Sequence, residues 1–252
     1  MSELLPPQSQ PARARWFARG IANIAAIATV AVLAGSCASE KKPNDDPRLL
    51  VIDGIEITFA DLQPYFEWLK SFRPALGVKT TYIWALRDHV LPLKIAQREF
   101  PEERAKQLEL AEGLCSVADN IYDLEKESKL IEHKTRSNLT RQSAMLPVAK
   151  WLFEMTAIEG KNIPINTNAA SQPIELAQGY FVVGSYDFFD SPMVMTEYVD
   201  ALQVGFVTHT SIAWRKWYEN EQLTLGKKVT FVHPDYRDNL PHWMELPKNK
   251  KP

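Results

Sequence analysis

Alternating apolar and polar positions predict a short β-hairpin at the start of the folded region. In LLVIDGIEITFADL, residues 49–62, leucine and isoleucine alternate with polar residues on both sides of Asp53-Gly54. An Asp-Gly pair between such runs favours a two-residue turn with positive φ. Thr58 and Asp61 have the spacing of a capping box, which starts a helix. We therefore expect two short strands that lead directly into a helix.

Helices are predicted to follow this hairpin. The first covers residues 59–72, where apolar and aromatic side chains recur every three or four positions. The second runs from residue 80 to residue 100 and is expected to bend at Pro92, because proline removes a helical hydrogen bond. The third begins at Pro101, since proline followed by two acidic residues is typical of a first helical turn. Residues 128–158 also favour helix, with an interruption at proline 147.

The pattern changes after this helical region. Residues 160–175 are rich in Asn, Pro, Ser and Gly, which is typical of a linker. Strands are predicted in GYFVVGSYDFF and KKVTFVH, and helices around MTEYVDAL and SIAWRKWYENEQL. The sequence thus predicts a mainly α fold with a smaller α+β part: a helical module at residues 49–159, the linker at 160–175 and a small α/β module at 176–252.

Composition places the chain among ordinary folded proteins. Of the 252 residues, 45% are hydrophobic and 24% are charged. The formal net charge is −2, whereas nucleic-acid recognition normally needs a basic surface. We therefore expect no nucleic acid among the partners.

The N-terminus has the layout of a secretory signal. Three arginines precede the apolar run IANIAAIATVAVL, which small residues follow. This run is shorter than the roughly 20 apolar residues that span a bilayer. The segment AGSC resembles the lipobox of bacterial lipoproteins, which implies cleavage of residues 1–36 and lipidation of Cys37. Residues 37–48 then form a polar tether, and the protein is expected in the bacterial cell envelope, facing the periplasm or the cell exterior. An uncleaved signal anchor and a plain helix are the alternatives.

Catalytic and metal-binding motifs are not found in the sequence. The five histidines lack zinc-ligand spacing, and neither a G-x-S-x-G elbow nor a phosphate-binding glycine loop occurs. We therefore predict no catalytic residue, metal or cofactor. Cys115 lies in an apolar helical pattern and is expected to be a small core residue. Trp214 and Trp217 are candidate anchors for a partner or a lipid interface, with simple packing as the alternative.

Two segments suggest a known family. VIDGIEITFADLQPYFEWLK, followed by ALRDHVLPLKIAQREFPEERAKQ, resembles the opening of SurA-type periplasmic chaperones over residues 49–130. In that family a parvulin prolyl isomerase domain often follows, and VMTEYVDALQVGFVT is similar to a parvulin segment. The resemblance implies a substrate-pocket position for Met195 and Tyr198. The histidine strand and glycine hairpin of parvulins are missing, so this module resembles a degenerate parvulin without isomerase activity.

These observations favour a membrane-anchored, chaperone-like lipoprotein that binds exported polypeptides in aromatic grooves. A structural accessory subunit of a membrane protein complex would use the same surface chemistry. An active peptidyl-prolyl cis-trans isomerase is the third hypothesis. It requires a cleft that joins Met195 and Tyr198 to a histidine and a polar residue from distant strands.

Overall fold

Helices and strands occur in both halves of the computed structural model, which describes residues 46–158, 161–191 and 196–245. The fold is mixed α+β. The helical segments are α1 (Phe59–Phe72), α2 (Val78–Ala85), the π-helix η2 (Leu86–Val90), α3 (Leu91–Glu99), α4 (Pro101–Cys115), α5 (Ile121–Glu127), α6 (Leu146–Leu152), α7 (Ser211–Leu225), η3 (Gly226–Lys228) and η4 (Pro234–Asn239). The strands are β1 (Arg48–Ile52), β2 (Ile55–Thr58), β3 (Lys134–Thr140), β4 (Met155–Ile158), β5 (Lys161–Pro164), β6 (Ile174–Leu176), β7 (Gly179–Ser191), β8 (Thr196–Val207) and β9 (Val229–Val232). The predicted signal and tether up to residue 45, with Cys37, lie outside the described residues.

The predicted hairpin and its capped helix are confirmed. Asp53 and Gly54 have φ values of 49° and 78°, as a turn with positive φ requires. The Asp61 backbone N–H donates to Thr58 Oγ1 over 3.2 Å, and the Thr58 N–H donates to the Asp61 carboxylate over 2.8 Å. This reciprocal capping box satisfies two backbone donors and starts α1 at Phe59.

The second predicted helix is interrupted just before Pro92. Pro92 has no N–H to donate to the carbonyl four residues earlier, so a regular α-helix cannot continue through this position. The chain instead widens into the π-helix η2, in which the Leu91 N–H donates to the Leu86 carbonyl. Residues 86–90 therefore form a single wide π-helical turn between α2 and α3.

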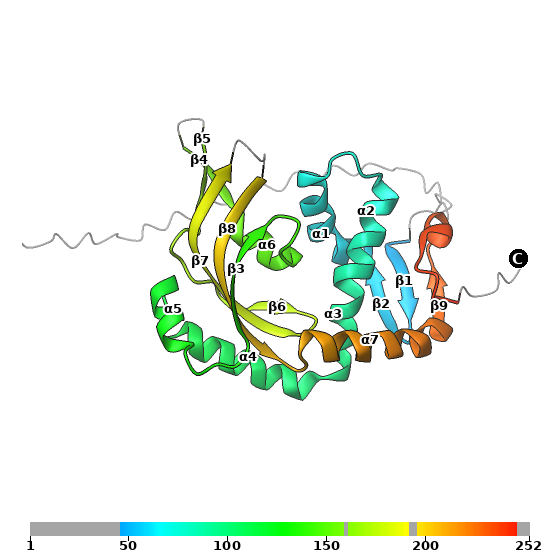
Figure 1. Cartoon of the computed structure of the whole chain (residues 1–252). Helices are drawn as coiled ribbons and strands as arrows, with labels where there is room; N and C mark the ends of the chain where they lie inside the picture. Colours follow the sequence, from blue (N-terminus) through cyan, green and yellow to red (C-terminus); the bar gives the residue numbers. More distant parts are fainter. Residues whose placement is uncertain (1–45, 159–160, 192–195, 246–252) are drawn as a thin grey trace, which may run out of the picture. The chain divides into compact units, whose positions relative to one another are not determined.

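The two ends of the described chain form one unit, which we call the terminal module, residues 46–100 and 210–245. Its sheet has the order β2-β1-β9, with Leu50 of β1 opposite Val232 of β9. One apolar core joins β1, β2 and α1–α3 to residues near the C-terminus, among them Leu225 and Tyr236. Figure 1 shows α7 and β9 beside the N-terminal strands and helices.

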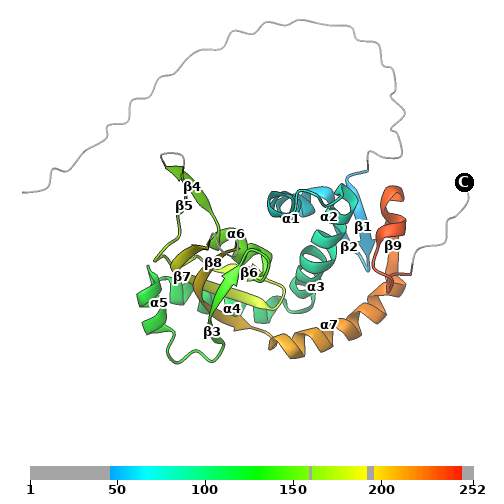
Figure 2. The ribbon, with the colours of Figure 1, turned by 45° about the horizontal axis from the view of Figure 1, so that its top comes forward.

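Residues 101–209 lie between α3 and α7 in the sequence, and we call them the central module. Its antiparallel sheet has the order β3-β8-β7-β6, with α4 and α5 against one face and α6 against the other (Figure 2). Neighbouring residues of β7 point to opposite faces: Val182 packs with α4 and α5, and Val183 packs with α6. Both faces of the sheet are thus covered, which explains why β7 and β8 carry apolar residues at consecutive positions.

Several predicted elements differ from the structure. The helix expected around MTEYVDAL is wrong, because this segment lies in β8 and pairs with β7 and β3. Residues 128–158 hold β3, α6 and β4 rather than continuous helix. The predicted linker, residues 160–175, holds β5 and the first two residues of β6. Residues 229–232, assigned by sequence to the second module, pair with β1 of the first. In residues 134–140 and 196–202, local preference for helix yields to long-range strand pairing.

Candidate binding cleft

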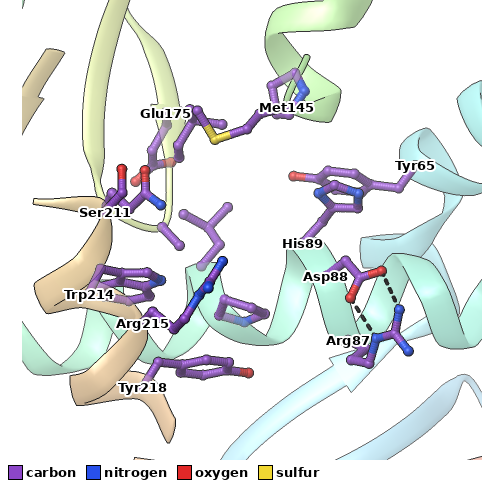
Figure 3. Close-up of a pocket in the computed structure, with 16 residues that line it drawn as sticks. Tyr65, Arg87, Asp88, His89, Met145, Glu175, Ser211, Trp214, Arg215 and Tyr218 are labelled. Carbon is purple, nitrogen blue, oxygen red and sulfur yellow. Dashed lines mark hydrogen bonds and ion pairs between the residues drawn. The ribbon is translucent and has the colours of Figure 1, made fainter. Parts of the chain in front are cut away.

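A cleft of about 440 Å³ lies where the terminal and central modules meet. Figure 3 shows its side chains converging from α1, η2, α7, the start of α6 and the β6–β7 turn. The lining combines aromatic and aliphatic side chains with charged and polar ones: Tyr65, Arg87, Asp88, His89, Pro92, Leu93, Met145, Pro147, Glu175, Leu176, Ala177, Gln178, Ser211, Trp214, Arg215 and Tyr218. A concave site with this mixture is typical of a ligand-binding pocket.

The π-helix supplies one wall of the cleft. Arg87 donates to both carboxylate oxygens of Asp88, over 2.6 and 2.7 Å. The imidazole of His89 stacks on Tyr65, with ring centroids 5.2 Å apart and an interplanar angle of 11°. Burial lowers the pKa of His89 to about 4, so the ring is neutral at pH 7. Its nitrogens, which have no hydrogen bond to another described residue, offer one donor and one acceptor to a ligand.

Helix α7 supplies the second wall. It begins after Thr210, whose hydroxyl accepts a hydrogen bond from the Ala213 N–H. Trp214 is only 6% exposed and stacks on Tyr218 with an interplanar angle of 8°. Burial raises the pKa of Tyr218, so this phenol also stays neutral. Between these two aromatic residues in the sequence, the exposed Arg215 extends into the cleft (Figure 3).

The β6–β7 turn forms the third wall, and Arg104 of α4 holds it from behind. The Arg104 guanidinium donates to the carbonyls of Leu176 and Ala177 over 3.0 and 3.1 Å and to the Glu175 carboxylate over 2.8 Å. This guanidinium is only 4% exposed, whereas arginine is rarely buried without partners. Glu175 also accepts a hydrogen bond from the Tyr180 hydroxyl. The turn is thus tied to α4 through main-chain and side-chain atoms.

A second cavity of about 370 Å³ adjoins the cleft along the sheet of the central module. Both cavities share Met145, Gln178 and Ser211 as lining residues. The second cavity is also lined by Phe181 of β7 and Gln203 of β8. The two cavities therefore form one site that continues from the helices onto the sheet.

Of the predicted site residues, the structure brings Trp214 and Trp217 together, with ring centroids 5.0 Å apart. Cys37 and Met195 lie outside the described residues. Tyr198 is in β8, stacks on Phe189 at a centroid distance of 4.8 Å and lines neither cavity. Trp214 lines the cleft, and Trp217 packs against Phe100 with centroids 4.8 Å apart. Tyr198 lies in a strand and not in the helix predicted around MTEYVDAL, because residues from 196 onward form β8.

Sequence reasoning missed most of the cleft. Arg87, Asp88 and His89 looked like ordinary helix positions, and only the nearby Pro92 signalled an irregularity. Arg104 lies in the first turn of α4, and a charged side chain in a helix is normally solvated. Its partners are more than 70 positions away, so no local pattern indicates them.

Other chemistry has little support in the part of the chain that the structure describes. Within residues 46–158, 161–191 and 196–245, no cluster of three or more His, Cys, Asp or Glu could hold a metal ion. No helix in these ranges is long and apolar enough to cross a membrane. The pKa of the Cys115 thiol is raised by burial, which opposes thiolate formation, and the thiol donates to the Ser171 carbonyl over 3.4 Å.

The cleft has the features of a recognition site. Ser211 and His89 both line it, and neither hydrogen-bonds to another described side chain, so both side chains can bond to a ligand. The aromatic walls suit apolar groups, and the polar side chains suit amides or carboxylates. Comparison with known proteins adds no relative: no family model, curated protein or solved structure matches the chain.

Proposed function

We propose that this protein binds extended or partly folded polypeptides in the cleft and its adjoining cavity. The observation that carries the proposal is the continuity of the two cavities through Met145, Gln178 and Ser211. Together they follow α7 and the β6–β7 turn onto the sheet, which gives an elongated rather than a closed site. An extended chain advances about 3.3 Å per residue, so such a site accommodates several consecutive residues of a client.

The lining suits a polypeptide of mixed sequence. Tyr65, Tyr218 and Leu93 line the cleft and are partly exposed, so they offer apolar surface to client side chains. Gln178, Ser211 and the neutral His89 offer hydrogen bonds to client backbone amides, which cost free energy if they are buried without partners. Both kinds of contact are independent of one particular client sequence. The site therefore fits a chaperone-like binder.

The proposal includes attachment to an envelope membrane through an acylated Cys37. It also includes a SurA-like origin of residues 49–130, which is supported by the order of hairpin, capped helix and further helices. Isomerase activity is left out, because Tyr198 lines neither cavity. The attachment is tested by membrane fractionation of the full chain and its Cys37→Ser variant. Equal membrane association of both would contradict the acyl anchor.

Binding is tested with a variant that fills the site without changing charge. Met145 lines both cavities, so Met145→Trp should obstruct them together. Leu130→Trp is the matched control, because Leu130 is fully exposed at 100% and lines neither cavity. Fluorescence anisotropy with a labelled, reduced and carbamidomethylated protein reports binding of an unfolded client, and the same protein in its folded form is the negative control.

We expect the wild type and Leu130→Trp to bind the unfolded client with a dissociation constant on the order of 10 μM, about −7 kcal/mol. Met145→Trp should bind at least about tenfold more weakly, a loss of about 1.4 kcal/mol. Equal binding by the two variants would place the client elsewhere and refute the proposed site. Failure of the wild type to bind any unfolded client, together with capture of one stoichiometric membrane complex, would favour the accessory subunit instead.

A further inference from the structure

Among the ionised side chains that line the cleft, Arg215 is the one without a partner of opposite charge among the described residues. Arg87 pairs with Asp88, and Glu175 pairs with the buried Arg104 behind the turn. Arg215 is the remaining charged residue of the lining. Within the described residues, no hydrogen bond or ion pair joins Arg215 to a partner. In the adjoining cavity Glu132 and Lys134 carry opposite charges, so they add no net charge to the site.

The surroundings of Arg215 suit a carboxylate that lies beside an apolar group. Trp214 and Tyr218 flank it on α7, and Leu93 lies on the facing helix α3. A planar guanidinium binds a carboxylate through two parallel hydrogen bonds, which are strong when water is partly excluded. The first turn of α7, with Ser211 in the cleft, adds the positive partial charge of a helix N-terminus nearby.

We infer that the cleft selects client segments in which an aspartate or glutamate side chain lies beside an apolar or aromatic residue, with the carboxylate on Arg215. This inference rests on the proposed function. An internal acidic side chain fits better than a chain terminus, because the site continues past Ser211 into the second cavity and a bound segment can extend there. The apolar neighbour packs on Tyr218 and Leu93, and the backbone meets Gln178 and Ser211.

Blocked peptides of equal length test this selectivity directly. They carry a central Phe-Asp-Leu, Phe-Asn-Leu or Phe-Lys-Leu, and a fourth peptide combines Phe-Asn-Leu with a free terminal carboxylate. Binding to the full chain is measured by fluorescence anisotropy at two salt concentrations. Arg215→Gln removes the charge in the cleft, and Lys216→Gln is the matched control, because Lys216 is the exposed neighbour on α7 that lines neither cavity.

We expect the Asp peptide to bind about tenfold more tightly than the Asn peptide, as a hydrogen bond to a charged group would give, and the Lys peptide most weakly. Arg215→Gln should abolish the preference for Asp, and Lys216→Gln should retain it. High salt should reduce the preference. Unchanged urea midpoints confirm that both variants fold.

Three results would overturn the inference. Equal, measurable binding of the Asp and Asn peptides would refute carboxylate selection and leave the proposed polypeptide binding intact. Retention of the Asp preference in Arg215→Gln would refute the role of Arg215. A preference only for the free terminal carboxylate would refute an internal acidic residue. Absence of binding by every peptide and by the unfolded client would instead refute the proposed function itself.

Discussion

Replacement of Arg104 by leucine should loosen the β6–β7 turn and destabilise the protein. Leucine keeps part of the aliphatic stem of arginine and removes the guanidinium, which bonds the carbonyls of Leu176 and Ala177 and the carboxylate of Glu175. The change therefore leaves two main-chain acceptors without their donor at a position that is 4% exposed. Because buried acceptors without partners cost free energy, the folded state should lose stability.

The magnitude follows from the exposure of the partners. Breaking one side of a fully buried ion pair costs about 3–5 kcal/mol. The Glu175 side chain is 32% exposed and keeps its hydrogen bond from Tyr180, so part of its charge is rehydrated. We therefore expect the lower end of that range, about 3 kcal/mol, for Arg104→Leu.

Urea unfolding followed by tryptophan fluorescence measures this loss. Arg136→Leu is the matched control: Arg136 also pairs with a carboxylate, that of Asp200 at 2.7 Å, but its side chain is 50% exposed. Exposed pairs contribute about 1 kcal/mol or less. A double-mutant cycle with Glu175→Gln separates the ion pair from the carbonyl contacts. A loss for Arg104→Leu no larger than that for Arg136→Leu would refute the reasoning.

Further predictions concern a turn, a buried histidine and a helix cap. Gly179→Ala should lower the free energy of unfolding, measured in urea, by at least about 1 kcal/mol, because Gly179 has a φ of 149° and a Cβ there would meet the Phe206 carbonyl. Gly113→Ala is the control: its Cβ would have open space, so this change should be neutral or stabilising. The folded pKa of His89 is about 4, against an ordinary value of 6.5. As the pH falls from 6.5 to 4, only the unfolded chain gains the proton, so the free energy of unfolding should fall by about 3 kcal/mol. Urea titrations at pH 7 and pH 4 measure this difference, and it should be correspondingly smaller in His89→Phe. Thr58→Ala should lower the unfolding free energy by about 1 kcal/mol through loss of the capping box, and an undiminished value would contradict that role of the hydroxyl.

Local signals in the sequence predicted local structure well. The Asp53-Gly54 turn, the Thr58 cap and the start of α4 at Pro101 each depend on residues within about one helical turn of one another. The strand β7 was also predicted, because β-branched and aromatic residues dominate it. The formation of these elements depends mainly on residues that are close in the sequence.

The remaining structure depends on partners that are distant in the sequence. Residues 196–202 favour helix by composition, yet they form β8 because β7 and β3 provide partners on both sides. The cleft combines residues of α1, η2, α6, β6 and α7, so none of its contacts has a sequence motif. Pro92 indicates an irregular helix in the sequence, but that the π-helix residues line the cleft is known only from the structure.

The pairing of β1 with β9 has a consequence for biogenesis. During synthesis Leu50 emerges early, and its partner Val232 follows only after the central module has been made, roughly 10 to 40 s later at ordinary translation rates. Until then one edge of β1 is unpaired beside apolar side chains, and such an edge can pair with other nascent chains. A premature stop before β9 should therefore yield an aggregation-prone product even though α1–α3 are fully encoded.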